Sequence, residues 1–327
     1  MKKKLLVGIV LSMVGVFVLG ACSNGGKKLD NVNETKKAST AVDKKKENQT
    51  IEVIDGEGKK VEVPSKPKRV VVFDNGSLDT IDALSVGDRV VGVPAKSIPN
   101  YLSNYRKVSS AGRIKEPDLE KVNQLKPDLI IISGRQEDYK EKMEQIAPTL
   151  YMSVDDTDTW RSTKHNIETV GKIFDKEKEA RTKVKDLEKE VTDLKTKASQ
   201  LDQKALTVIV NEGQLSTFGK KSRFDVIYDT FGFKEADEKI KPSIHGQSVS
   251  YEYVLEKNPD FLFVVDRTKA IGGDDSHNNV AENELVKKTE AGKHNKVIPL
   301  RPDVWYLSGG GLESLHLMVE DAKKALD

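Results

Sequence analysis

Three arginines stand where they could bind an anion. Arg135 and Arg267 each follow directly on a short apolar run, 128–132 and 260–265, and Arg223 lies in a loop rich in lysine. In open parallel sheets, ligands bind beyond the carboxyl ends of the strands. Guanidinium groups offer paired donors and stack on rings, so they suit planar, delocalised oxyanions. Together the three predict a cleft for an anionic ligand, although each one alone is equally consistent with a solvated surface arginine.

Arg135 and Arg267 also occupy matched places in an internal repeat. Residues 118–131 align without a gap with residues 250–263. Each copy contains a helical segment, a Pro-Asp pair, an apolar strand and, at the same distance beyond the proline, the arginine. A repeat of this length predicts two related lobes that face one cleft.

Two further side chains could contact the ligand. His245 lies in a short loop before a helix, where a single histidine is most often structural or solvated. Tyr306 follows Trp305 and comes after the strand 296–300, with Gly309–Gly311 behind it. No Lys-Ser/Thr pair follows these glycines, so they do not form a phosphate-binding loop. They either let the backbone approach a ligand or open the last helix.

The sequence contains no recognisable catalytic set. There is no nucleophile elbow and no His-Glu-x-x-His pair, and the five histidines are scattered. A net charge of +2, with many charges of both signs, also argues against a nucleic-acid footprint. We therefore expect a binding protein without an intrinsic cofactor, and not an enzyme.

Strands alternating with helices must position these residues. This order predicts an α/β fold with parallel, doubly wound sheets. The stretch from Thr159 to Leu201 is dominated by charged residues, with an apolar stripe at Val184, Leu187, Val191 and Leu194 that indicates one long helix joining the lobes. The expected organisation is a signal peptide at 1–21, a flexible tether at 22–50, an amino-terminal lobe at 51–163, a spine helix at 164–204 and a carboxy-terminal lobe at 205–327.

The first residues predict export and lipidation. Lys2–Lys4 precede the apolar run Leu5–Leu19, and Gly20-Ala21 lead to Cys22, the only cysteine of the chain. A positive start, a short apolar region and small residues at a cleavage point are typical of a secretory signal. Cys22 would carry the lipid and anchor the protein on the outer face of the cell membrane. The alternative is an ordinary signal peptide with a stray cysteine.

From about residue 51 onward, the chain resembles the siderophore-binding lipoproteins of iron ABC importers, specifically the petrobactin and enterochelin-uptake group. The resemblance rests on five segments. They are Leu125–Gln136, Ser222–Phe224, Ile244–Ser248, Glu256–Arg267 and Trp305–Gly309. The first is shared loosely by the whole superfamily, and the arginine, His-Gly and Trp-Tyr-Leu segments are more specific to the catecholate-binding group.

This resemblance implies a bilobal fold of the class III periplasmic-binding-protein type, with one spine helix and small hinge motion. It implies that Arg135, Arg223 and Arg267 hold catecholate oxygens of a ferric siderophore, with petrobactin as the first choice. His245 and Tyr306 would complete the iron shell when the siderophore is tetradentate. Glu120 and Glu252 would dock the two lobes onto an ABC permease, which works with its ATPase.

Other ligands and other classes stay open at this stage. Haem, cobalamin or a hydroxamate siderophore would fit the same fold, although three arginines favour a catecholate over near-neutral hydroxamates. A surface-anchored enzyme or an adhesion lipoprotein is the alternative from another class. Fluorescence of Trp305, expected near the cleft, would separate these possibilities when a ferric catecholate is added.

Overall fold

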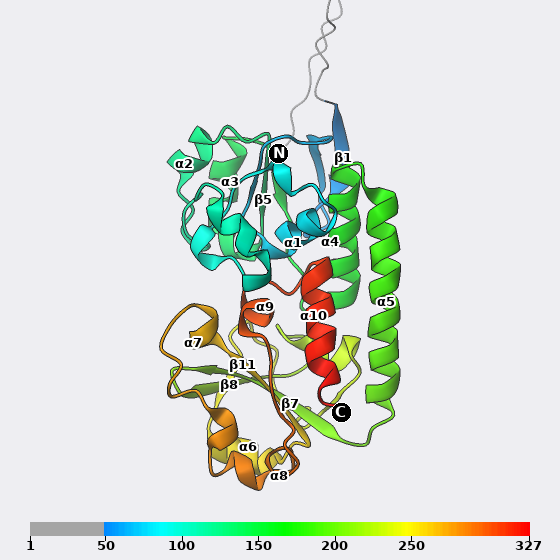
Figure 1. The fold of residues 1–327 in the computed structure, drawn as a ribbon, viewed down its shortest axis with the longest axis vertical. Coiled ribbons are helices and arrows are strands. Elements are labelled where there is room, and N and C mark those ends of the chain that lie inside the picture. Colours follow the sequence, from blue (N-terminus) through cyan, green and yellow to red (C-terminus); the bar gives the residue numbers. More distant parts are fainter. Residues whose placement is uncertain (1–48) are drawn as a thin grey trace, which may run out of the picture. The chain divides into compact units, whose positions relative to one another are not determined.

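The computed structural model describes residues 49–327, which hold three β-sheets and the helices that pack on them (Figure 1). The predicted signal peptide, Cys22 and most of the predicted tether lie outside the described residues. Within 49–327, no helix combines the length and the apolarity needed to cross a membrane.

The amino-terminal lobe is built on a four-stranded parallel sheet in the order β4-β3-β5-β6. Its strands are β3 (Val70–Val72), β4 (Val90–Gly92), β5 (Leu129–Ile132) and β6 (Thr149–Tyr151). Every residue of β5 is buried, because Leu129 and Ile131 face one hydrophobic cluster and Ile130 and Ile132 face another. A sheet covered on both faces explains why the strand reads as a continuous apolar run.

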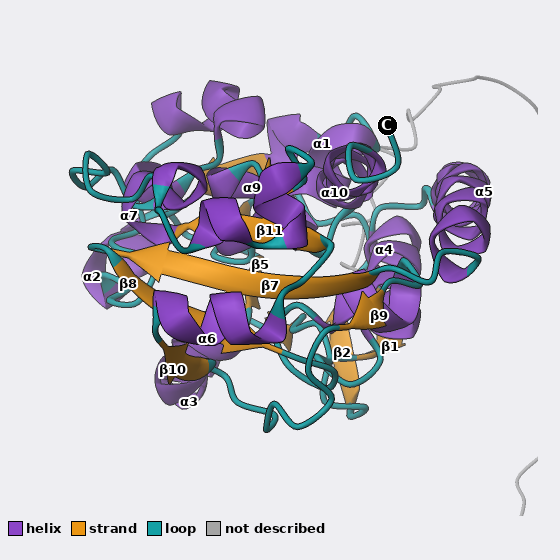
Figure 2. Cartoon of the chain, turned by 90° about the horizontal axis from the view of Figure 1, so that it is seen from below, coloured by secondary structure: helices purple, strands orange, loops and turns teal. Residues whose placement is uncertain are grey.

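A six-stranded sheet forms the carboxy-terminal lobe, in the order β10-β8-β7-β11-β12 with β9 beside β7. Its strands are β7 (Lys204–Asn211), β8 (Gln214–Phe218), β9 (Lys234–Glu235), β10 (Gln247–Val249), β11 (Phe261–Asp266) and β12 (Val297–Pro299). The pairs β7–β11 and β11–β12 are parallel, whereas β8 pairs antiparallel with both β7 and β10. Helices lie on both sides of β7, with α6 on one side and α9 and α10 on the other (Figure 2). The predicted α/β class is confirmed, with an antiparallel edge that the sequence analysis did not anticipate.

The remaining elements are short. The α-helices of the two lobes are α1 (Asn75–Ala83), α2 (Leu119–Gln124), α3 (Lys140–Glu144), α6 (Tyr251–Lys257), α7 (Arg267–Ala270), α8 (Glu290–Lys293) and α9 (Pro302–Leu307). Tighter turns are η1 (Gly87–Arg89), η2 (Ala95–Ser97), η3 (Asn100–Lys107), η4 (Gly134–Tyr139), η6 (Val280–Glu282) and η7 (Val286–Lys288), and Val226–Thr230 is a π-helix. A hairpin precedes the first lobe, formed by β1 (Thr50–Ile54) and β2 (Lys60–Pro64), which pair antiparallel.

The expected spine helix at 164–204 is two helices in the structure, α4 (Thr159–Ile173) and α5 (Glu177–Ser199). Asp175 ends the first helix by adopting a left-handed backbone with φ of 59°. Aspartate tolerates this conformation, so the helix ends without the glycine or proline that would have signalled a break. The predicted apolar stripe of α5 is confirmed, since Val184, Leu187, Val191 and Leu194 are buried.

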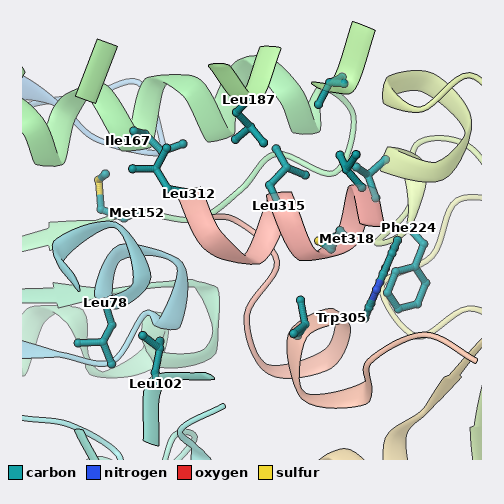
Figure 3. Packing of buried hydrophobic residues seen from close by; sticks show 14 of the residues in the cluster. Leu78, Leu102, Met152, Ile167, Leu187, Phe224, Trp305, Leu312, Leu315 and Met318 are labelled. Carbon is teal, nitrogen blue, oxygen red and sulfur yellow. The ribbon is translucent and has the colours of Figure 1, made fainter. Parts of the chain in front are cut away.

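The last helix, α10 (Leu312–Lys323), packs against α1 and α5 as well as against α9. Leu315 of α10 faces Leu187 of α5 (Figure 3). Both belong to a hydrophobic cluster that continues into the amino-terminal lobe at Leu78 and into the carboxy-terminal lobe at Phe263. The predicted start of the carboxy-terminal lobe at residue 205 therefore separates the two main sheets. Helix α10 nevertheless contacts elements on both sides of this boundary.

Asp79 of α1 is the polar link between the amino-terminal lobe and α10. Its carboxylate accepts the backbone N–H groups of Glu313 at 2.8 Å and Ser314 at 2.7 Å, so it caps the start of α10. The phenol of Tyr101 donates to it at 3.2 Å. Burial raises the pKa of Asp79 to about 6, although these hydrogen bonds oppose the shift.

Candidate ligand-binding site

A cleft of about 640 Å³ is lined by residues of both lobes. From the amino-terminal lobe come Asp74, Ser133 and Ser153, each placed just after the carboxyl end of β3, β5 or β6. From the other side come Arg223, Phe224, Val226 and Ile244, together with Ser308–Gly310 of the segment between α9 and α10. The cleft therefore lies where ligands of open α/β sheets are expected.

Arg135 and Arg223 line this cleft and donate hydrogen bonds to the same acceptor. Nη2 of Arg135, which follows β5, donates to the backbone carbonyl of Tyr306 at 2.9 Å. Nη2 of Arg223, which precedes the π-helix, donates to the same oxygen. Two guanidinium groups from different lobes thus meet at one carbonyl.

Arg267 completes the group from a third segment. It is the first residue of α7, directly after β11, and its Nε donates to the phenol oxygen of Tyr306 at 2.8 Å. Its Nη1 donates to the amide oxygen of Asn211 at the end of β7. The guanidinium carbons of Arg223 and Arg267 lie 4.3 and 5.5 Å from the centre of the Tyr306 ring. The three arginines singled out in the sequence therefore converge on Tyr306, although Arg267 and Tyr306 are not themselves among the residues that line the cleft.

The arginines change the acidity of this site. Burial, followed by the charge of Arg135, lowers the pKa of Arg223 to about 10, so Arg223 still carries its charge at neutral pH. Burial alone would raise the pKa of Tyr306. The hydrogen bond from Arg267 and the charges of the three arginines outweigh it, and the pKa of the phenol is lowered. The arrangement favours negative charge, whether on a ligand or on Tyr306 itself.

Tyr306 lies in helix α9, which begins soon after strand β12. Pro302 stands at the first position of this helix, a place where proline is favoured because its missing N–H is not needed. The glycines that follow serve the approach of two backbones. A Cβ on Gly76 of α1 would lie 2.9 Å from the carbonyl carbon of Gly310. Gly311 then begins α10, as one of the two readings of this run predicted.

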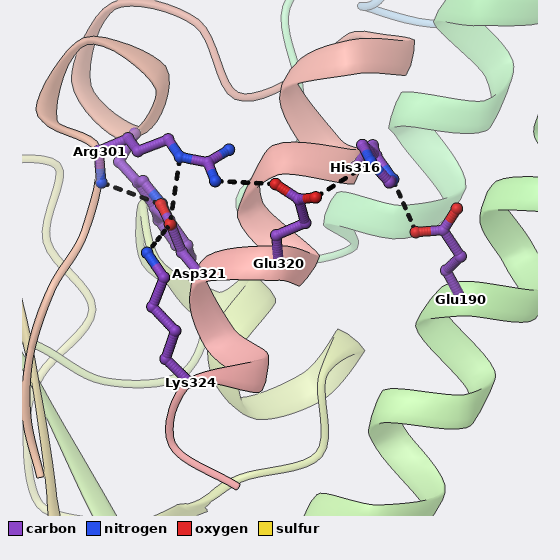
Figure 4. Close-up of polar contacts among 7 residues, drawn as sticks. Glu190, Arg301, His316, Glu320, Asp321 and Lys324 are labelled. Carbon is purple, nitrogen blue, oxygen red and sulfur yellow. Dashed lines mark hydrogen bonds and ion pairs between the residues drawn. The ribbon is translucent and has the colours of Figure 1, made fainter. Parts of the chain in front are cut away.

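Trp305 borders the cleft, but it is only 2 % exposed. Its ring packs beside Phe224 and Phe231, with centroids 6.2 and 6.5 Å away. Its indole N–H donates to the carboxylate of Asp321 at 3.1 Å. Around Asp321, Arg301 and Lys324 form ion pairs, and His316 of α10 bonds to Glu190 of α5 (Figure 4). Trp305 is thus held in the core, and its contact with ligand stays a prediction.

His245 is exposed in the irregular segment before β10. Its backbone N–H donates to the hydroxyl of Ser243 at 3.2 Å. Its neighbour Ile244 lines the cleft, whereas His245 does not. Among residues 49–327, no three His, Cys, Asp or Glu side chains gather as a metal site. Within these residues, no hydrogen bond joins His245 to Tyr306, and their pairing as iron ligands stays a prediction.

Glu120 and Glu252 occupy equivalent places in the two lobes. Each is exposed and is the second residue of its helix, α2 or α6. Each helix is followed by a left-handed residue before the proline, Lys126 with φ of 47° and Asn258 with φ of 43°.

The aspartate after each proline then connects its strand to the start of the neighbouring strand by hydrogen bonds. Asp128 accepts the N–H of Lys68 and Arg69, and Asp260 accepts that of Lys204. The sequence repeat is therefore repeated in the structure.

Four acidic residues of the cleft were missed in the sequence, Glu137 and Asp138 close to Arg135 and, elsewhere, Asp74 and Asp156. Asp74 follows β3 directly and caps α1, and the rule that located Arg135 after its strand could have found it. Asp156 lies in the loop after β6, where no sequence signal marks it. Burial raises the pKa of Asp156, against the opposing charge of Arg223. The lining of the cleft thus combines the cationic groups of Arg135 and Arg223 with carboxylates.

Comparison with known proteins agrees with this geometry. A model of the periplasmic binding protein family matches residues 70–304. The petrobactin-binding protein YclQ of Bacillus subtilis (strain 168) is 44% identical over 330 residues, which cover 100% of both chains. The ferric-anguibactin-binding protein FatB of Vibrio anguillarum (strain ATCC 68554 / 775) is 31% identical over 273 residues, 80% of this chain and 83% of FatB.

Solved structures show the same relationship. The crystal structure of YclQ has a TM-score of 0.83 and 45% identity, and covers 85% of this chain and 99% of that chain. The catecholate-siderophore-binding protein VctP of Vibrio cholerae has a TM-score of 0.79 and 34% identity, and covers 84% and 100%. These matches confirm the resemblance and the fold that were inferred from the sequence.

Proposed function

Since the chain belongs to the periplasmic binding protein family, we propose that it is the extracytoplasmic binding lipoprotein of an ABC importer and captures a ferric catecholate siderophore. The observation that supports this most directly is the convergence of Arg135, Arg223 and Arg267 on Tyr306 beside the cleft. A ferric catecholate carries net negative charge and planar rings, and guanidinium groups bind both.

Petrobactin is the first choice of ligand. Its support is the 44% identity to a petrobactin-binding protein over the whole chain. The siderophore holds the iron, so the protein recognises the complex and needs no cofactor of its own. In this role the protein binds and releases its ligand without chemical change and is not an enzyme.

The proposal extends to the membrane and to the transporter. Cys22 would carry the lipid anchor on the outer face of the membrane, and relatives that are 27% and 25% identical are named lipoproteins. Glu120 and Glu252 would meet an ABC permease, one on each lobe. A Cys22→Ser variant that still carries labelled acyl chains would refute the anchor.

A ligand panel tests the function. Ferric petrobactin, a ferric tris-catecholate, a ferric hydroxamate, haem and cobalamin are titrated separately while tryptophan fluorescence is followed. We expect saturable binding of the catecholates, with petrobactin the tightest. Preference for the hydroxamate, haem or cobalamin would assign another ligand to the same fold, and no binding of any of them would refute the proposal.

A further inference from the structure

Ile244 is exposed to an unusual degree for a large apolar side chain. Among the described residues, the exposed large hydrophobic side chains are Ile244 at 75 % and Ile271 at 52 %. Ile244 lines the cleft, and Ile271 does not. A single exposed isoleucine needs no explanation by itself, but one at the edge of a ligand cleft marks apolar surface that a ligand can cover.

The chain around Ile244 is held at two points and free between them. On one side Ile240 is 8 % exposed and belongs to a hydrophobic cluster of the carboxy-terminal lobe. On the other side Gly246 has φ of 76°, and a Cβ there would lie 2.6 Å from the Phe218 ring. Only glycine fits this place, because both the left-handed backbone and the close ring exclude a side chain.

The tip between these anchors, residues 241–245, has no regular secondary structure. Within the described residues, the tip has one hydrogen bond, from the His245 N–H to the Ser243 hydroxyl, and both partners belong to the tip itself. Few bonds and much exposed surface are the features of a segment that opens locally at low cost. The tip can therefore shift while Ile240 and Gly246 stay in place.

We propose that Ile244 is the apolar contact of the site and packs on the face of a catecholate ring when the tip closes over the ligand. Phe224 and Val226 of the same lobe also border the cleft, next to Arg223, but each is only 1 % exposed, so Ile244 is the apolar side chain free to contact a ligand there. Covering the ring removes water from the oxygens that the arginines bind, and charge–charge attraction is stronger when water is excluded. The inference rests on the proposed function, because it takes the ligand to be a ferric catecholate.

The first test compares two matched isoleucines. Ile244→Ser and Ile271→Ser remove the same side chain from two exposed sites, and Ile244→Val keeps an apolar group. With a ferric bis-catecholate as the probe, Ile244→Ser should weaken binding roughly five- to thirtyfold, the loss expected when most of a buried isoleucine is removed. Ile271→Ser and Ile244→Val should bind within about twofold of the wild type.

The second test detects closure directly. Cys22 is the only cysteine, so in a Cys22→Ser background Ile244→Cys carries the single thiol of the chain. Its alkylation by a maleimide should slow at least severalfold when the ferric bis-catecholate is added. The matched Ile271→Cys protein should react at an unchanged rate.

The outcomes separate this inference from the proposed function. If the wild-type protein binds no ferric catecholate, the proposed function fails first. If the wild type binds the ferric catecholate and Ile244→Ser binds it equally well, the proposed function remains supported and the apolar contact is refuted. An alkylation rate at Ile244→Cys that ligand leaves unchanged would refute closure of the tip.

Discussion

The Nε of Arg267 lies 2.8 Å from the phenol oxygen of Tyr306. This contact joins the end of strand β11 to helix α9, and it holds the tyrosine side chain while two other arginines bind its backbone carbonyl. Tyr306 thus occupies the position where positive charge is concentrated. Its acidity and its contact with ligand should both depend on the arginines.

Removing Arg267 should make Tyr306 a weaker acid. Arg267→Ala deletes both the hydrogen bond and one of the charges that lower the pKa of the phenol, and leaves the effect of burial, which raises it. Spectrophotometric titration near 295 nm measures tyrosine ionisation, and subtraction of a Tyr306→Phe curve isolates this residue. We expect the Tyr306 step to move to higher pH in the Arg267→Ala protein. A step at the same pH in both proteins would show that the contact does not control the phenol.

Each of the three arginines that converge on Tyr306 should contribute strongly to affinity. Arg135→Ala, Arg223→Ala or Arg267→Ala removes a charge-assisted contact worth roughly 1.5–3 kcal/mol, which is about one to two decades in Kd for a ferric catecholate. Lysine at these positions should restore only part of the affinity, since it cannot make the paired contact. Arg181→Ala, on the exposed face of α5, is the control. Losses below twofold for all three alanine variants would contradict charge recognition.

Asp79 should make stability depend on pH. Its folded pKa of about 6 is above the ordinary value of 3.8, so the folded protein binds the proton more tightly than the unfolded chain. The stability that this group contributes is complete below pH 3.8 and is lost as the pH rises to 6, by an amount on the order of 3 kcal/mol. Urea unfolding of wild type and Asp79→Asn at pH 4, 5, 6 and 7 measures it. The stability difference between wild type and variant should move against the wild type as pH rises, and a constant difference would refute the shift.

The sequence predicted the features that follow from local pattern. The fully apolar runs at β5 and β11 indicated strands covered on both faces, and their ends located Arg135 and Arg267. The gapless repeat predicted that Glu120 and Glu252 are equivalent, which their helix positions confirm. These results need only the chemistry of neighbouring residues.

Features that depend on long-range packing were not predictable in the same way. The break between α4 and α5 occurs at Asp175, which adopts a left-handed backbone. Aspartate also occurs inside helices, so its presence in the sequence does not predict a break. The acceptor for Arg135 and Arg223 is a backbone carbonyl, and every residue has one, so nothing in the sequence marks Tyr306 for that role. The exposure of Ile244 likewise depends on how its segment is anchored, and its apolar character alone suggested burial.

Docking on a permease should require both lobes. Glu120 and Glu252 are exposed at the same position of equivalent helices, so a partner with twofold pseudosymmetry could contact both. Reversal of both charges to lysine should abolish siderophore uptake by cells and leave the Kd for the ligand unchanged, because neither residue lines the cleft. The matched control is Glu141→Lys with Glu256→Lys, on the neighbouring helix α3 and on α6. Normal uptake by the Glu120/Glu252 double reversal would dispose of the docking role.

The last prediction concerns iron coordination by His245 and Tyr306. Ferric iron takes six donors, so a siderophore with three bidentate arms leaves no position for the protein, whereas one with two arms leaves two. Phenolate oxygen is a hard donor suited to ferric iron, and imidazole also binds iron. The arginines already favour loss of the Tyr306 proton, and the metal would favour it further. His245 is exposed beside Ile244, so closure of the tip would have to carry it to the iron.

The two ligand classes therefore give a direct comparison. His245→Ala and Tyr306→Phe should weaken binding of a ferric bis-catecholate much more than binding of a hexadentate tris-catecholate. The visible charge-transfer band should differ between wild type and Tyr306→Phe with the bis-catecholate alone. Tyr139→Phe, whose ring packs against a hydrophobic cluster of the amino-terminal lobe, should leave it unchanged. Equal losses for both ligands would assign packing or hydrogen-bonding roles to the pair. An identical spectrum in the Tyr306→Phe protein would exclude phenolate ligation, since a phenolate bound to the iron adds its own charge transfer to that of the catecholates.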